Sequence, residues 1–99
     1  MLNVVELVLY KLKKEVSEQH FLNASDECNA GFISLQKGFI NRKLVKRDDT
    51  WADIVLWETM QDAMSAAKAA ENSSAGKTFF ECIDTNTCEM QHLTVVKSY

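Results

Sequence analysis

At 99 residues, of which 46% are hydrophobic and 25% charged, the chain has the size and composition of one globular domain. A formal net charge of −3 and a sequence pI near 5.3 argue against a nucleic-acid partner, which requires a basic patch. The N-terminal apolar run contains Glu6 and is far shorter than the ~20 residues of a membrane span, while three cysteines without a secretory signal favour the reducing cytoplasm.

The first predicted element is a strand over residues 4–12, "VVELVLYKL". Its odd-numbered positions from Val5 to Leu9 are aliphatic, whereas its even-numbered positions include Glu6 and Tyr10. Alternate side chains of a strand project from opposite faces. We therefore expect this strand to pack against other residues on both faces, with the carboxylate of Glu6 on one of them. A helix follows, capped by Ser17, running to about Ala30 and ended by Gly31.

The central segment predicts a hairpin. Residues 38–46, "GFINRKLVK", form one strand, residues 47–50 form a polar turn, and "TWADIVLWE" forms the next strand. In this third strand Trp51, Asp53, Val55 and Trp57 share one face, and Ala52, Ile54 and Leu56 share the other. One face is therefore aliphatic, and the other is aromatic with an acid in it.

The last third of the chain predicts a helix, further helical turns and a strand. Thr59 with Asp62 resembles a capping box at the start of the helix, and residues 76–83 form one or two additional turns. After a turn over residues 84–87, residues 89–96 form the last strand, in which Met90 and His92 share one face and Leu93 lies on the other.

The element order β-α-β-β-α-β predicts a ferredoxin-like α+β fold, with two helices on one face of a four-stranded antiparallel sheet, as a single domain over residues 1–99. We expect the aliphatic strand faces to point toward the helices. The aromatic face would then be an exposed apolar patch, for which the economical cover is a second copy of the same sheet. The sequence therefore predicts a homodimer.

The chain resembles the dimeric α+β barrel superfamily, in particular its antibiotic biosynthesis monooxygenase-like domains, through "VVELVLYKLKKEVSEQHFL", "GFINRKLVKRDDTWADIVLWETMQDAMSAA" and the closing strand. This resemblance implies a face-to-face dimer with a cavity between sheet and helices or between the two sheets. It also implies cofactor-free oxygenation, isomerisation, mutarotation or haem degradation. Haem-degrading members use a histidine near the second helix, whereas this chain has none between Phe21 and Gln91, so we expect no cofactor.

Candidate catalytic residues come from three adjacent predicted strands. Glu6, Asp53 and His92 are expected to share one sheet face, where a histidine beside a carboxylate can act as a general base and a buried carboxyl as a general acid. Candidate ligand-binding residues on the same face are Tyr10, Arg42, Val55, Trp57 and Met90. Lys43 replaces Arg42 if the second strand has the other parity. No local spacing indicates a metal site.

Two classes of function follow from this pattern. The first is a homodimer that binds a small, largely apolar molecule and acts on it as a cofactor-free oxygenase or isomerase. The second is a non-catalytic module, either ligand-binding or purely structural, in which the polar residues satisfy one another and the tryptophans fill space. A cavity of roughly 300 Å³ or more discriminates a metabolite site from packing.

Overall fold

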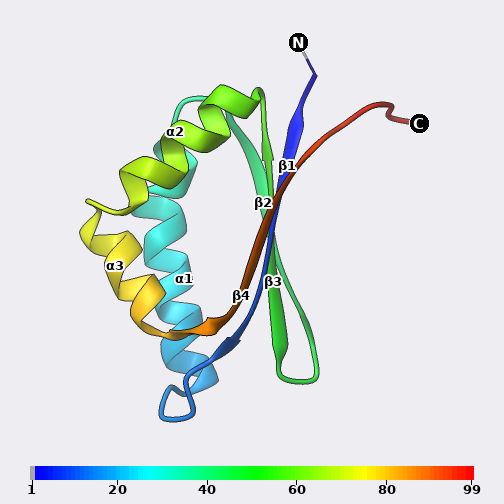
Figure 1. Cartoon of the computed structure of the whole chain (residues 1–99). Coiled ribbons are helices and arrows are strands. Elements are labelled where there is room, and N and C mark those ends of the chain that lie inside the picture. The colour runs from blue at the N-terminus through cyan, green and yellow to red at the C-terminus, as the bar shows by residue number, and fades with distance from the viewer. Residues whose placement is uncertain (1) are drawn as a thin grey trace.

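The computed structural model describes residues 2–99, which form a four-stranded sheet with three helices on one face (Figure 1). The elements are β1 (Val4–Leu12), α1 (Glu18–Gly31), the short 3₁₀ helix η1 (Ile33–Leu35), β2 (Phe39–Arg47), β3 (Thr50–Trp57), α2 (Met60–Ala70), α3 (Ser74–Glu81) and β4 (Ile83–Thr94). The predicted ferredoxin-like fold is confirmed, and the helical turns predicted near residue 76 form a separate helix, α3.

The sheet has the order β2-β3-β1-β4, with every neighbouring pair antiparallel. The first and third strands are central and the fourth lies beside the first, as expected for this fold. The helix starts are also where the sequence places them. The Ser17 hydroxyl accepts a hydrogen bond from the backbone N–H of His20, and the Thr59 hydroxyl accepts one from Asp62.

The predicted orientation of the sheet is wrong, because the helices cover the aromatic face. Phe21 of α1 packs against Trp51 of β3 with ring centroids 4.9 Å apart and against Tyr10 of β1 at 6.0 Å. Trp57 packs in a second cluster with Ala63 of α2. Both faces of the strands are apolar, so strand periodicity separates them without showing which one the helices cover. The rings of Phe21 and Phe79 on the helices complete an aromatic core.

The aliphatic face consequently lies on the side of the sheet away from the helices. Register places Val5 beside Leu56 and Leu93, and Leu7 beside Ile54. The full set of apolar residues of this outer face is Val5, Leu7, Leu9, Val45, Ala52, Ile54, Leu56 and Leu93. Val45 and Leu93 are 42% and 45% exposed. The outer face, and not the aromatic face, is the apolar surface left uncovered within one chain.

Several boundaries differ from the predictions: α3 begins and ends two residues before the predicted 76–83, β2 lies one residue after the predicted 38–46, and β4 ends at Thr94 and not at residue 96. The hairpin turn is shorter than the four residues expected, because Arg47 pairs directly with Thr50 and Asp48 adopts a left-handed φ of 54°, which aspartate tolerates. The predicted turn over residues 84–87 is instead the irregular start of β4, where the backbone N–H of Lys11 donates to the Thr87 hydroxyl. Within residues 2–99 no helix has the length and hydropathy needed to cross a membrane.

Candidate functional site

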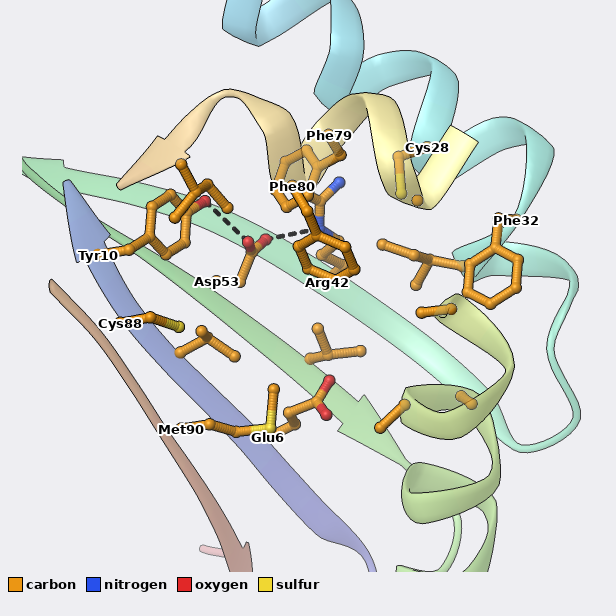
Figure 2. A pocket seen from close by; sticks show the side chains of 18 of the residues that line it. Glu6, Tyr10, Cys28, Phe32, Arg42, Asp53, Phe79, Phe80, Cys88 and Met90 are labelled. Carbon is orange, nitrogen blue, oxygen red and sulfur yellow. Dashed lines mark hydrogen bonds and ion pairs between the residues drawn. The ribbon is translucent and has the colours of Figure 1, made fainter. Parts of the chain in front are cut away.

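A cavity of about 140 Å³ lies between the sheet and the helices (Figure 2). Its floor is the inner face of β1 and β3, its walls come from α1, α2 and α3, and β4 supplies Cys88 and Met90 at one side. The lining is mostly apolar, with Glu6, Arg42 and Asp53 as its charged members. A concave apolar space with a few convergent polar groups is the usual form of a small-molecule site.

One polar group of the cavity is a closed network around Asp53. Arg42 Nε donates to Asp53 Oδ1 at 2.6 Å, and the Tyr10 hydroxyl donates to Asp53 Oδ2 at 2.8 Å (Figure 2). The Arg42 guanidinium also donates to the Ser25 hydroxyl at 2.9 Å, and it lies 5.4 Å from the centroid of the Phe79 ring. Both carboxylate oxygens of Asp53 and the positive charge of Arg42 are thus already engaged.

Burial in this network affects the phenol of Tyr10. Loss of hydration raises the pKa of Tyr10 far above its ordinary value of 10.0, and the negative charge of Asp53 together with the hydrogen bond to it raises that pKa further. Tyr10 is only 1% exposed and remains a neutral hydrogen-bond donor at any physiological pH. Burial likewise raises the pKa of the Cys28 thiol on the helix side of the cavity.

The second polar group is the pair of Glu6 and His92. Glu6 Oε2 lies 2.9 Å from His92 Nε2, and the two side chains are 11% and 15% exposed. Glu6 lines the cavity, where Figure 2 shows its carboxylate on the helix side of β1, whereas His92 of β4 contacts it from outside the lining. Among residues 2–99 no donor is bonded to Glu6 Oε1, so one oxygen of this carboxylate is free.

Trp57 supplies an unusual feature of the lining. Its side chain is almost fully buried, 2% exposed, yet its indole Nε1–H has no hydrogen-bond acceptor within residues 2–99. A buried donor without a partner costs about 1–3 kcal/mol. Val4 pairs with Trp57 and Glu6 pairs with Val55, so Trp57 and Glu6 occupy adjacent rows of the inner face. Trp57 lines the cavity with other atoms of its side chain, whereas this nitrogen is itself buried within the packed cluster of Trp57 and Ala63.

The structure separates the predicted catalytic cluster into two parts. Glu6 and His92 are paired, whereas Asp53 is hydrogen-bonded to Arg42 and Tyr10 and not to either of them. All five predicted ligand-binding residues, Tyr10, Arg42, Val55, Trp57 and Met90, line the cavity. Lys43 pairs with Ile54 and shares its outer face, so it is excluded from the cavity. Residues 2–99 contain no group of three or more His, Cys, Asp or Glu that could hold a metal ion.

Several cavity residues were missed in the sequence. They are the helix-side walls, chiefly Cys28, Phe32, Ala66, Ala67, Ala70, Phe79 and Phe80, together with Ser25 behind Arg42. The adjacent rings of Phe79 and Phe80 were a usable signal, since an apolar face on the last helix must contact the sheet. That signal points to the cavity only when the helices are placed over the aromatic face.

No protein-family model and no curated protein matches the chain. Solved structures do match over nearly its whole length. A protein from Bordetella bronchiseptica, provisionally described as an antibiotic biosynthesis monooxygenase, has a TM-score of 0.80 at 16% identity, covering 98% of this chain and 100% of that one. SnoaB, a cofactor-independent oxygenase from Streptomyces nogalater, has a TM-score of 0.78 at 14% identity, covering 99% and 97%.

A dimeric ferredoxin-like protein from an uncultured marine organism is also similar, with a TM-score of 0.66 at 7% identity, covering 100% of this chain and 92% of that one. Identities this low establish a shared fold. The fold implied by the resemblance to antibiotic biosynthesis monooxygenase-like domains is therefore confirmed.

Proposed function

We propose that the chain binds a small, largely apolar carbonyl compound in the cavity between sheet and helices and removes a proton from it without a cofactor. The observation that supports this proposal is Glu6, a carboxylate that lines an apolar cavity with one oxygen unbonded. Asp53, the other acid of the lining, accepts a hydrogen bond on each oxygen, from Arg42 and from Tyr10, and in this proposal stabilises the fold. Glu6 is therefore the base.

In the proposed reaction Glu6 Oε1 takes a proton from the carbon next to the ligand carbonyl. The C–H electron pair moves into the carbonyl group and forms an enolate. His92 holds the carboxylate in place through the contact at 2.9 Å. A correctly oriented base of this kind contributes roughly 10²–10⁴ in rate.

Two outcomes follow from the same enolate. In an isomerase Glu6 returns the proton to a different carbon, and no electrons leave the substrate. In an oxygenase the enolate transfers electrons to molecular oxygen and a C–O bond forms; the peroxide takes up the proton and loses water. A CH₂ group and O₂ thereby become a C=O group and H₂O. SnoaB, which shares the fold, is a cofactor-independent oxygenase, and this favours the second outcome.

A non-catalytic role is the second candidate, favoured by the volume of the cavity. At about 140 Å³ the cavity is roughly half the 300 Å³ at the lower end of metabolite sites. In this alternative the cavity holds a small apolar ligand, or is a packing defect, and Glu6 only pairs with His92.

Deuterium loss from phenylacetone separates these functions. With both methylene hydrogens replaced by deuterium, the proposal predicts loss of deuterium to water at a rate that the protein accelerates and that Glu6→Gln reduces about 100-fold. Oxygen uptake, measured in parallel, distinguishes the oxygenase from the isomerase. Binding of phenylacetone without faster exchange supports the non-catalytic alternative, and a wild-type rate in Glu6→Gln contradicts the assignment of the base.

We also propose that the outer face makes a homodimer. Its aliphatic centre includes Leu7, Ile54 and Leu93, and a contiguous patch of this kind on a monomer is covered by association. One related fold is that of a dimeric ferredoxin-like protein. Ile54→Glu is expected to convert the dimer to a monomer in sedimentation analysis, whereas Met64→Glu on the exposed side of α2 leaves it dimeric. A wild-type monomer at micromolar concentration contradicts the dimer.

A further inference from the structure

We infer that the ligand of this cavity is an uncharged molecule with a single ring and one carbonyl group. This inference rests on the proposed function, because it uses the same cavity and the same base. It adds the size, the charge and the hydrogen-bonding capacity of the ligand, each of which follows from a separate property of the lining.

The volume sets the size. An apolar cavity of about 150 Å³ holds one benzene ring, and sites for larger ligands begin at about 300 Å³. The cavity of this chain measures about 140 Å³. One six-membered ring fits that space, whereas a fused two-ring or three-ring system requires the walls to move.

The cavity wall that limits the size of the ligand consists of aromatic side chains that pack against one another. Phe79 lies 5.3 Å from Phe21 and 6.3 Å from Tyr10, between centroids, and carries the Arg42 guanidinium over its face. It is 4% exposed and fixed in the core. Phe80 also lines the cavity, but it is 44% exposed, and its ring packs edge-on to that of Phe79 at 5.8 Å. Phe80 is therefore the wall side chain that can move to admit a larger ligand.

The charges of the lining disfavour an anionic ligand. Arg42 is the positive charge among the lining residues, and Asp53 and Ser25 already engage it. The lining holds a second carboxylate, Glu6, whose partner His92 contacts it from outside the lining, so no cationic side chain of the lining is free to bind an anion. Arg42 therefore offers no free charge to an anionic group, and an uncharged ligand is the one that the cavity favours.

The oxygen of Glu6 that remains free defines the polar part of the ligand. Glu6 Oε1 has no donor among residues 2–99, and the proton transfer proposed above requires an acidic C–H beside it. A carbonyl group makes the C–H next to it acidic, and the ring then lies against the apolar walls near Phe80.

Calorimetric titration of the full chain with three probes tests the inference. Phenylacetone carries one ring, 2-naphthylacetone carries two with the same side chain, and phenylacetate carries one ring with a negative charge. We expect phenylacetone to bind at least about tenfold more tightly than either of the others, since forcing an oversized ring into a packed site costs on the order of tenfold or more. Phe80→Ala is expected to abolish the discrimination against the naphthyl compound while the discrimination against phenylacetate persists.

Met64→Ala is the matched control, because Met64 is 53% exposed and lies outside the lining. It is expected to bind all three probes as the wild type does. Equal affinity of the wild type for phenylacetone and 2-naphthylacetone overturns the size limit, and tighter binding of phenylacetate overturns the charge assignment. If the wild type discriminates between the three probes as expected but does not accelerate deuterium exchange, the ligand class is supported and catalysis is refuted. Absence of binding by any probe refutes both.

Discussion

The inner face of the sheet carries two carboxylates whose surroundings differ in one decisive respect. Asp53 accepts hydrogen bonds on both oxygens, from Arg42 and Tyr10, and is locked into the core. Glu6 is bonded to His92 on one oxygen and has the other free toward the cavity. In the proposed function the carboxylate held on both oxygens stabilises the fold, and the carboxylate with an unbonded oxygen takes the proton. The pattern of partners, and not burial alone, separates these two proposed roles.

The largest effect is expected from Asp53→Ala. This change leaves the buried guanidinium of Arg42, whose side chain is 6% exposed, without its counter-charge, and removal of one partner of a buried pair costs about 3–5 kcal/mol. The free energy of unfolding, measured with urea, is expected to fall by this amount. The double variant Arg42→Met/Asp53→Ala removes both charges and is expected to be more stable than Asp53→Ala. If the single variant is as stable as the wild type, Asp53 is not structural.

Glu6→Gln is expected to show the opposite profile. The rate of deuterium loss from phenylacetone falls about 100-fold, equivalent to about 2.7 kcal/mol, because glutamine cannot accept the proton. Stability changes by less than about 1.5 kcal/mol, since the amide keeps an oxygen for His92. Urea unfolding and deuterium exchange rates, measured on the same preparation, check the expected stability and the expected loss of rate. A large loss of stability with an unchanged rate would reverse the roles of the two acids.

Tyr10→Phe is expected to destabilise the fold by removing one of the two hydrogen bonds to Asp53. Loss of the hydroxyl removes one bond to a charged oxygen and is expected to cost about 2 kcal/mol. Because the pKa of Tyr10 in the folded chain is raised above 10.0, its contribution to stability is complete below about pH 10 and is lost as the pH rises further. Wild-type stability should therefore decline more steeply between pH 10 and 11 than that of Tyr10→Phe. Parallel profiles contradict the raised pKa.

His92 gives the smallest effect. His92→Leu removes the group that orients Glu6, and loss of one such hydrogen bond is expected to slow exchange about tenfold. His92→Gln retains an N–H donor and is expected to restore most of the rate. Recovery in the glutamine variant identifies His92 as a positioning residue, whereas equal loss in both variants indicates that the imidazole itself transfers the proton.

The strand order could be predicted from the β-α-β-β-α-β element order, and the helix caps and the grouping of the inner-face residues could be predicted from local spacing. Ser17 and Thr59 mark helix starts through their side chains, and Glu6, Asp53 and Trp57 share a face through strand parity. Which face the helices cover could not be predicted. That choice depends on how Phe21 and Phe79 meet the strands, which is a property of tertiary packing.

The separation of Asp53 from Glu6 was beyond the sequence for a related reason. Register places Asp53 beside Val8 and Leu44, and Glu6 beside Val55 and His92, so the two acids lie in different rows. Strand parity shows on which face of the sheet a residue lies. It does not show which residues of the neighbouring strands pair with it. Whether Arg42 or Lys43 faced inward was equally open, because the register shift between Phe39 and Asn41 sets the parity of β2.

The most direct measurement is the position of phenylacetone on the sheet. Ile54 and Val55 are consecutive residues of β3 on opposite faces, Val55 in the cavity and Ile54 on the outer face. Nuclear Overhauser effects between ligand protons and their methyl groups therefore report the face that is occupied. The proposed site predicts strong effects to Val55 and none to Ile54. Effects to Ile54 without effects to Val55 would place the ligand between two sheets and contradict the assignment of Glu6 as the base.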